Sequence, residues 1–251
     1  LESNLDEEVI TASTYGRGVW QSPIPVQVPD TDVRLVSLTP ANGAVLCSDV
    51  APRVTVENNG NNLIEEVSVS YTLNGGGVQQ ETVSLNLGAG ASEVIDLPLL
   101  DLGDKGEDVL VVSVTTPGDA FSDNNSTEHR FYSNAFGQGT QINDFEGAGT
   151  ELLTYTDGSD QVVWEKGVPS GSVLGEAASG SEAYGTNLDG NHPDGVRAYL
   201  VSECYDLSAI LAPVLKFQMA YDLEENFDIV YVQYSTDEGA NWSILGSVDS
   251  Q

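Results

Sequence analysis

The chain has 251 residues, of which 39 are acidic and 8 are basic, and its formal net charge at pH 7 is −31. This charge excludes nucleic acid and anionic membranes as partners, because both are bound through basic patches. Hydrophobic residues make up 40% of the chain, enough for a folded core, and no apolar run approaches the ~20 residues that span a bilayer. We therefore expect a folded protein with no nucleic-acid partner and no membrane insertion.

The first 32 residues divide into a strand-like piece and a proline-rich stretch. Residues 9–12 have strand-forming side chains and precede the phrase Tyr-Gly-Arg-Gly-Val-Trp at 15–20. Prolines at 23, 25 and 29 indicate a stiff polar linker over 26–32. The phrase resembles the closing strand of a secreted β-propeller of the sortilin or BNR-repeat type. That resemblance implies that residues 1–25 are the tail of an upstream propeller-like domain.

Residues 33–133 alternate apolar and polar side chains with the period of two that is typical of half-buried strands. The alternation forms four runs: Val54 and Val56; Val67, Val69, Tyr71 and Leu73; Val83, Leu85 and Leu87; Leu110, Val112 and Val114. Clusters of Gly and Asn separate the runs, as turns do. The pattern predicts an antiparallel β-sandwich of about 100 residues.

Two phrases in this segment are typical of a known family. Residues 54–60 read Val-Thr-Val-Glu-Asn-Asn-Gly, and Gly118-Asp119 is followed by Asp123-Asn124-Asn125. Both resemble the CARDB family, whose Ig-like modules repeat in large bacterial surface proteins and are named for a role in adhesion. The resemblance implies an Ig-like domain at 33–133 and a linker at 134–142.

The remaining residues, 143–251, carry a second set of phrases. In chain order these are Phe145-Glu146, Thr186-Asn187, the run 199–202, Asp206-Leu207-Ser208 and the run 234–237. The set resembles the MAM-like jelly rolls of secreted bacterial adhesins and immune inhibitor A-like peptidases. Glu203-Cys204 stands where the family has Ser-Pro, and Glu238 replaces a glycine, so the chain departs from the family at those turns. The resemblance implies a C-terminally incomplete jelly roll at 143–251, and the expected fold class is all-β: an Ig-like β-sandwich plus a partial jelly-roll β-sandwich.

An acidic turn lies near the end of this segment. An alternating run over 229–234 is expected to form a strand and leads into residues 235–242, which match the pattern Ser-x-Asp-x-Gly-x-x-Trp of the Asp-box hairpin. In such a turn we expect Asp237 to accept backbone hydrogen bonds, Gly239 to take positive φ and Trp242 to lie in the hairpin core. An Asp box braces a turn far more often than it touches a substrate, so we interpret it as structural.

The chain has two cysteines, Cys47 and Cys204, without the spacing of a metal site. Two arrangements are open: a pair of buried thiols, or one long-range bridge between domains. An exterior location permits the bridge, but sequence alone does not show that the two residues are close.

The sequence favours no catalytic site. It contains no HExxH, no nucleophile elbow and no phosphate-binding loop. His129 falls in a predicted strand and His192 in a predicted turn, where a hydrogen-bonded or exposed histidine is the common case. We therefore predict no catalytic residue and no enzymatic activity in this chain.

Calcium is the cofactor that the sequence favours. Calcium takes six to eight oxygen ligands in irregular geometry. The resemblance to jelly rolls implies a structural calcium between the first strand and a late loop, for which the candidate ligands are Glu146, Asp222, Glu224 and Asp228. Asn187 and Asp189 form a further oxygen-rich point. A solvated acidic loop is the alternative for the same residues.

Four aromatic residues are candidates for stacking on sugar rings: Trp164, Tyr184, Tyr199 and Tyr205. Strand aromatics are more often core residues, so core packing is the competing interpretation. Taken together, the sequence predicts a non-catalytic spacer and adhesion or ligand-binding region of a large secreted or cell-surface bacterial protein. Its expected partners are a glycan or a cell-surface protein, together with the rest of the parent polypeptide. The alternative is a set of accessory domains of a secreted hydrolase or peptidase whose active site lies outside this chain.

Overall fold

The computed structural model describes the backbone of residues 2–4, 9–14, 18–23, 28–138, 142–147, 152–156 and 163–246, with side chains from residue 28 onward. Regular structure in this part is β-strand apart from one 3₁₀ turn, η1 (Ser122–Asn124), so the predicted all-β class is confirmed. Among the described residues, no helix has the length and apolar character needed to cross a membrane.

The N-terminal strands form a sheet of their own. β1 (Glu2–Asn4), β2 (Val9–Thr14) and β3 (Gly18–Pro23) are antiparallel in the order β1-β2-β3. The strand expected at 9–12 lies within β2, while β1 was not expected. Residues 15–17 of the Tyr-Gly-Arg-Gly-Val-Trp phrase lie outside the described residues, and the propeller assignment stays a prediction.

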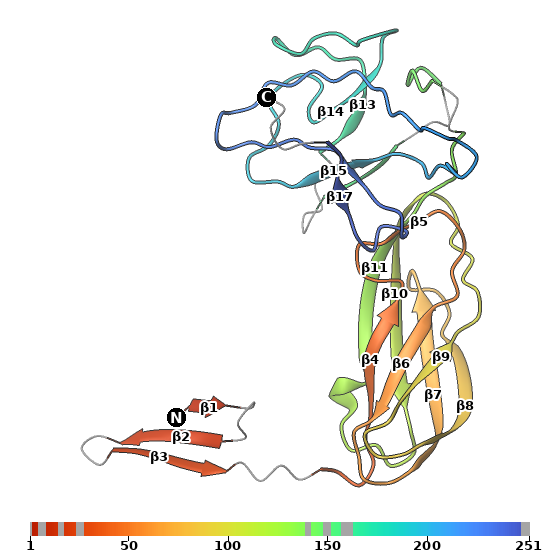
Figure 1. Cartoon of the computed structure of the whole chain (residues 1–251), viewed down its shortest axis with the longest axis vertical. Helices are drawn as coiled ribbons and strands as arrows, with labels where there is room; N and C mark the ends of the chain where they lie inside the picture. The colour runs from red at the N-terminus through yellow and green to blue at the C-terminus, as the bar shows by residue number, and fades with distance from the viewer. Residues whose placement is uncertain are drawn as a thin grey trace. The chain divides into compact units, whose positions relative to one another are not determined.

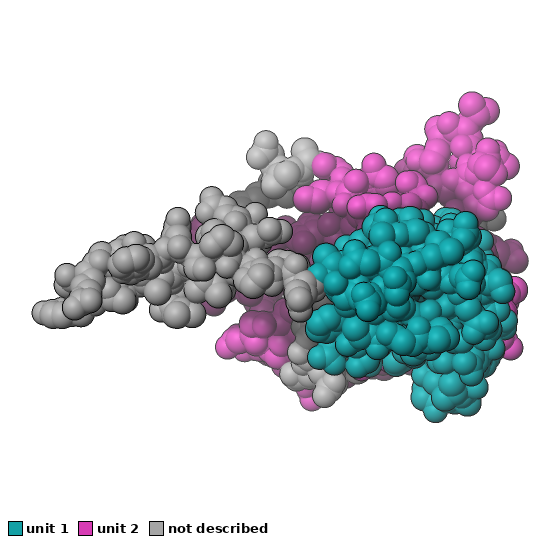
Figure 2. Space-filling view, turned by 90° about the horizontal axis from the view of Figure 1, so that it is seen from below, with its two compact units in different colours: residues 1–39, 53–97, 110–128 teal, residues 40–52, 98–109, 129–251 magenta. Residues whose placement is uncertain are grey.

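Contacts divide the chain into two compact units, which Figure 2 shows in different colours. Unit 1 comprises residues 1–39, 53–97 and 110–128, and unit 2 comprises residues 40–52, 98–109 and 129–251. Segments of the predicted Ig-like region thus contribute to both units. The predicted boundaries at 133 and 142 stay predictions.

Besides the strands β1 to β3, unit 1 contains strands of two facing sheets (Figure 1). One sheet has the order β4-β6-β9, and the other contains the neighbours β10, β7 and β8. All these neighbouring strands pair antiparallel. Their bounds are β4 (Val33–Thr39), β6 (Arg53–Asn58), β7 (Ile64–Leu73), β8 (Gln79–Leu87), β9 (Ser92–Asp96) and β10 (Gly106–Thr115).

Alternate residues of these strands fill the core, as the period-two pattern predicts. The fully buried aliphatic residues of unit 1 include Val33, Val54, Val56, Val67, Val69, Leu110, Val112 and Val114. Burying each such side chain contributes about 1.5–3 kcal/mol relative to leaving it exposed. In the run 83–87 only Leu87 is buried, because β8 is the last strand of its sheet.

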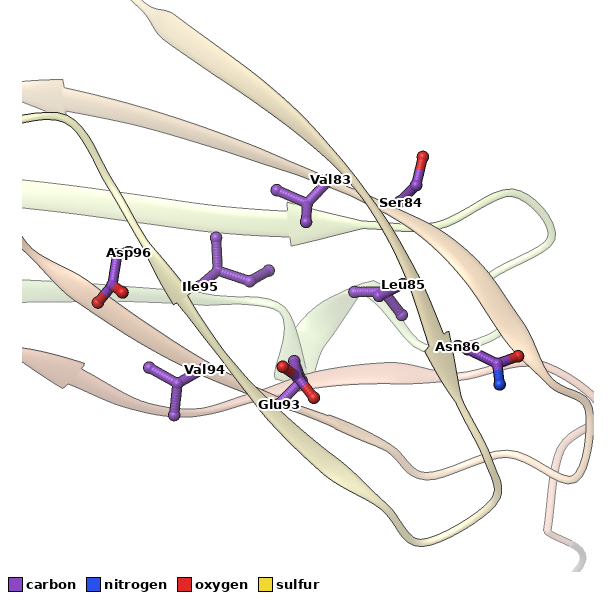
Figure 3. Close-up of a pocket in the computed structure, with 8 residues that line it drawn as sticks. All are labelled: Val83, Ser84, Leu85, Asn86, Glu93, Val94, Ile95 and Asp96. Carbon is purple, nitrogen blue, oxygen red and sulfur yellow. The ribbon is translucent and has the colours of Figure 1, made fainter.

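Between β8 and β9 lies a shallow hollow of about 400 Å³ (Figure 3). Leu85 and Ile95 point toward each other across it, while Glu93 and Asp96 bring carboxylates to its lining. The hollow follows from the open edge of the sandwich, where β8 and β9 are not hydrogen-bonded neighbours.

The larger sheet has the order β5-β11-β10-β7-β8, in which β5 (Val45–Leu46) runs parallel to β11 (Ser126–Ser133). Tyr132 lies opposite Val45 and Ser133 opposite Leu46. A three-stranded sheet packed on a five-stranded sheet in this order is an Ig-like sandwich, which confirms that part of the predicted fold class.

The described residues between 142 and 246 form three two-stranded ladders. β12 (Leu153–Thr156) pairs with β15 (Ala198–Val201), β13 (Glu165–Gly167) pairs with β14 (Ala183–Gly185), and β16 (Gln233–Tyr234) pairs with β17 (Ser243–Ile244). The strand expected over 229–234 is formed only at its last two residues. The reason is that residues 229–232 have no neighbouring strand within the described part of the chain. The jelly-roll assignment of this region stays a prediction.

Candidate functional site

Glu146, the first predicted calcium ligand, braces a loop. Its Oε1 accepts hydrogen bonds from the backbone N–H groups of Ser181 at 2.6 Å and Glu182 at 2.7 Å, and its Oε2 accepts one from Ser181 Oγ at 2.9 Å. The N–H of Glu182, then that of Ser181, holds the pKa of the Glu146 carboxyl below its usual range. A Cβ at Gly180 would collide with this carboxylate, so the loop approaches it as closely as only glycine allows.

Asp228 is engaged with other partners. Its Oδ2 lies 3.3 Å from His192 Nε2 and accepts the backbone N–H of Glu224 at 2.9 Å. Asp222 and Glu224 are exposed in the same loop. Within the described residues no three side chains of Asp, Glu, His or Cys come together as a metal site. Calcium at Glu146, Asp222, Glu224 and Asp228 therefore stays a prediction.

The third oxygen-rich point, at Asn187 and Asp189, is also a turn. Asn187 Oδ1 accepts the N–H groups of Asp189 and Gly190, both at 3.1 Å, and its Nδ2 donates to the carbonyl of Asn191 at 2.7 Å. The amide of Asn187 therefore makes the local bonds that are typical of an Asx turn.

The Asp-box turn has the expected internal bonds. The carboxylate of Asp237 accepts hydrogen bonds from the side-chain Nδ2 of Asn241 at 2.7 Å and from the backbone N–H of Asn241 at 2.9 Å. These bonds lower the pKa of the Asp237 carboxyl. Gly239 has φ of 75°, as predicted, and Glu238 has φ of 56°, a left-handed conformation that glycine adopts without strain. The prediction for Trp242 was wrong: its side chain is 36% exposed, because the β16–β17 hairpin has only two paired residues on each strand.

The same turn packs against β5 of unit 2. The carbonyl of Glu238 accepts the backbone N–H of Val45 at 2.9 Å. A Cβ at Gly239 would lie 2.6 Å from that nitrogen, so the close approach needs glycine. This turn therefore joins residues that are almost two hundred positions apart in the sequence.

Cys47 and Cys204 form a disulfide, with their Cα atoms 6.2 Å apart. Of the two arrangements that the sequence left open, the structure shows the bridge. It connects the residue after β5 to a residue three positions beyond β15, closing a loop of 157 residues.

Backbone hydrogen bonds surround the bridge. Cys204 exchanges them with residues 135 and 137, at 2.9 and 2.8 Å, and the N–H of Asn134 donates to Leu46 at 2.7 Å. The side chain of Asn134 also donates to the carbonyl of Ser202 at 2.9 Å. Residues 134–137, predicted as part of a linker, are thus bonded on two sides.

A ladder of three tyrosine rings lies in unit 2. Tyr132 of β11 stacks on Tyr155 of β12 with centroids 4.0 Å apart, and Tyr155 stacks on Tyr199 of β15 at 4.6 Å. Together with the disulfide and the Asp-box contact, this ladder defines what we call the seam: Val45, Cys47, Tyr132, Tyr155, Tyr199, Cys204 and Glu238. The seam was not predicted, because no local pattern links its members.

The candidate sugar-stacking residues have protein partners. Tyr199 belongs to the seam, and Tyr184 packs edge-on against Phe145 at 5.2 Å and accepts the N–H of Leu152 at 2.8 Å. Trp164 is half-buried. Tyr205 is 39% exposed, and its phenol has a raised pKa, first because of burial and then because of the charge on Glu203.

Both histidines have identified contacts. His129 Nδ1 lies 2.8 Å from the carbonyl oxygen of Pro40, and His192 pairs with Asp228 as described above. Each arrangement fixes a loop to a neighbouring segment. A histidine–carboxylate pair alone lacks the nucleophile or open metal position that hydrolysis needs.

No family model matches the chain. The chain is 38% identical over 88 residues to bacillopeptidase F of Bacillus subtilis (strain 168), a match that spans 33% of this chain and 6% of that protein. Among solved structures it is similar to a domain named as part of a cell surface protein of Methanosarcina acetivorans, with 26% identity and a TM-score of 0.35. The match covers 41% of this chain and 91% of that domain. It is also similar to the CARDB domain of the PF1109 protein in complex with di-metal ions from Pyrococcus furiosus, with 16% identity, TM-score 0.36 and coverage of 43% and 92%.

Proposed function

We propose that this chain is a non-catalytic accessory region of a secreted or cell-surface protein, which joins adjoining parts of that protein through the seam of unit 2. The observation that carries the proposal is the combination of a long-range disulfide with the tyrosine ladder and the docked Asp box. These contacts tie residues 44–47, 132–137 and 198–204 together by covalent, aromatic and backbone bonds. An accessory region needs such a connection in order to hold its neighbours at a fixed spacing.

The disulfide and the net charge both favour an extracellular location, as this proposal requires. Disulfides persist in oxidising compartments and are rare in the reducing cytosol. A net charge of −31 is also better tolerated where salt or divalent cations screen the repulsion between carboxylates. The similarity of an 88-residue segment to bacillopeptidase F is consistent with a parent protein that is secreted.

Adhesion is the finer part of the proposal, with a glycan or a cell-surface protein as the partner. It is supported by the side chains that residues 205–245 leave exposed, which include Tyr205, Phe217, Tyr221, Phe227, Tyr231 and Tyr234. Exposed aromatic rings bind sugar faces and protein surfaces at low entropic cost. The similarity to bacillopeptidase F favours a second candidate, an accessory region of a peptidase whose active site lies elsewhere in the parent.

The experiment that tests the non-catalytic proposal uses the purified 251-residue chain with peptide, ester and glycoside substrates. We expect hydrolysis no faster than in buffer. Turnover that disappears in the variant His192→Ala or Asp228→Asn would overturn the proposal. Binding to immobilised polysaccharides, measured in the same preparation, separates adhesion from a purely connecting role.

A further inference from the structure

Asp32, immediately before β4 in unit 1, is a fully buried carboxylate, with 0% of its surface exposed. Its oxygens accept hydrogen bonds from Asn59 Nδ2 at 2.5 Å and from Asn124 Nδ2 at 3.1 and 3.3 Å. Both donors are neutral amides, and Arg34 donates to Glu57 at 3.0 Å. Buried carboxylates are normally paired with a cation or coordinate a metal, because an isolated buried charge is costly.

Two buried amide oxygens lack a hydrogen-bond donor on the segment through which Asn124 reaches this carboxylate. They are the Oδ1 atoms of Asn124 and Asn125, and Asn125 is only 4% exposed. The same two amides bind carboxylates through their nitrogens: Asn124 binds Asp32, and Asn125 binds Asp119 Oδ2 at 2.7 Å. Buried polar atoms almost always have a hydrogen-bond partner, so we expect the two oxygens to contact a hydrogen-bond donor or a cation.

The backbone brings these groups together and holds them. The N–H of Ala120 donates to the carbonyl of Thr31 at 3.0 Å, which joins the segment before β4 to the loop that carries Asp119. The N–H of Asn59 donates to the carbonyl of Asp32 at 2.8 Å. A Cβ at Gly60 would lie 2.7 Å from the nitrogen of Asp32, so this turn packs as closely as a glycine permits.

We propose that these groups form a binding site for a divalent cation of the calcium type, with Asp32 as its central ligand and Asp119, Asn124 and Asn125 as the surrounding oxygen donors. Two carboxylates and two amide oxygens are hard ligands that suit calcium, with water completing the six to eight positions. The oxygen and nitrogen of a side-chain amide occupy the same shape. A half-turn of the Asn124 amide would therefore direct its oxygen to the cation in place of the nitrogen that now bonds to Asp32.

The site is separate from the predicted one at Glu146 and Asp222–Asp228, since all its members lie in unit 1. It contains two carboxylates and no histidine or cysteine. It also does not depend on the proposed function. The competing occupant is ordered water, which would satisfy the same two oxygens without binding calcium.

The test is a calorimetric titration of the metal-free 251-residue chain with calcium, followed by melting curves with calcium and with EDTA. We expect the native chain to bind calcium and to melt at a higher temperature when calcium is present. Asp32→Asn is expected to weaken calcium binding at least tenfold and to abolish the calcium-dependent part of the melting shift. Asp119→Asn is also expected to weaken calcium binding at least tenfold. Because Asp119 is partly exposed, this variant provides the test if the Asp32 variant does not fold.

Two control variants separate this site from general charge and from the other candidate. Asp101→Asn removes one exposed carboxylate, and Glu146→Gln removes the first residue of the site predicted from sequence. Both are expected to leave this binding event unchanged. A native chain without calcium binding at millimolar calcium, or binding that survives both Asp32→Asn and Asp119→Asn, would overturn the proposal.

Discussion

At the scale of single residues, the carboxylates of this acidic chain act as acceptors that fix turns. Glu146 binds two backbone N–H groups and a hydroxyl, and Asp237 binds one backbone N–H group together with the side chains of Asn241 and Ser235. Asp206 accepts the N–H of Ser208 at 2.9 Å, and its bonds to Ser208 lower its pKa. Each bond favours the ionised carboxyl, which is why the three pKa values fall.

These lowered pKa values make loop stability depend on pH. Because the folded-state pKa of Glu146 lies below the ordinary glutamate value of 4.5, its contribution to stability is complete above that pH and is lost as the pH falls through the folded-state pKa. We expect Glu146→Gln to lower the melting temperature at neutral pH, and the difference from the native chain to vanish at acid pH. Melting curves across that range measure it, with Glu176→Gln, an exposed residue, as the control. A difference that is constant with pH would rule out the charge of Glu146 as the cause.

Gly239 combines two demands, a positive φ and a close approach to Val45. Gly90 offers a matched comparison, because its φ of 71° is similar and a Cβ there would meet nothing within 4 Å. We expect Gly90→Ala to cost about 1–2 kcal/mol through its backbone conformation alone, and Gly239→Ala to cost more, since the Glu238–Val45 hydrogen bond must also shift. Chemical denaturation of both variants measures this, and equal costs would show that the turn does not depend on packing against β5.

At the scale of elements, sequence reasoning succeeded where neighbours in the sequence decide the outcome. The alternation at Val54, Val67 and Leu110 predicted strands whose inward side chains the structure shows buried, because alternate side chains of a strand face the same layer. The Asp-box turn was predicted for the same reason, since Asp237 and Asn241 bond within five residues. The tyrosine ladder escaped prediction because β11, β12 and β15 are far apart in the sequence, so no local pattern shows that Tyr155 pairs with Tyr199. Trp242 was misjudged because its motif does not show that the β16–β17 hairpin pairs over only two residues on each strand.

The tyrosine ladder gives a prediction at the level of β12. Tyr155 stacks on both Tyr132 and Tyr199, and each aromatic pair contributes about 0.5–1.5 kcal/mol beyond the area that it buries. We expect Tyr155→Ala to destabilise the chain by at least the sum of the two pairs, roughly 1–3 kcal/mol. Tyr231→Ala, at a residue that is 56% exposed, is expected to have a much smaller effect. Similar losses in the two variants, measured by denaturant titration, would contradict a stabilising role for the ladder.

At the scale of the whole molecule, the disulfide closes a covalent loop of 157 residues and limits the conformations open to the unfolded chain. For 157 residues the chain-entropy model gives a stabilisation of about 5 kcal/mol, within the range of native disulfides. We expect the variant Cys47→Ser/Cys204→Ser to melt roughly 10–20 °C below the oxidised native chain, since each kcal/mol shifts the melting temperature of a chain of this size by about 2–4 °C. Scanning calorimetry in the presence of a reductant provides the control, because the reduced native chain should then have the same melting temperature as the variant. A reductant that leaves the native melting temperature unchanged would show that the bridge does not stabilise the fold.

The disulfide between Cys47 and Cys204 joins the segment after β5 to the segment after β15, and mass spectrometry of the unreduced protein detects this bond directly. The native protein is first treated with an alkylating reagent without reductant and is then digested. We expect one cross-linked peptide pair that contains both cysteines, and negligible alkylation of either. Recovery of both cysteines as separate, alkylated peptides from protein made under oxidising conditions would show that the bond does not form.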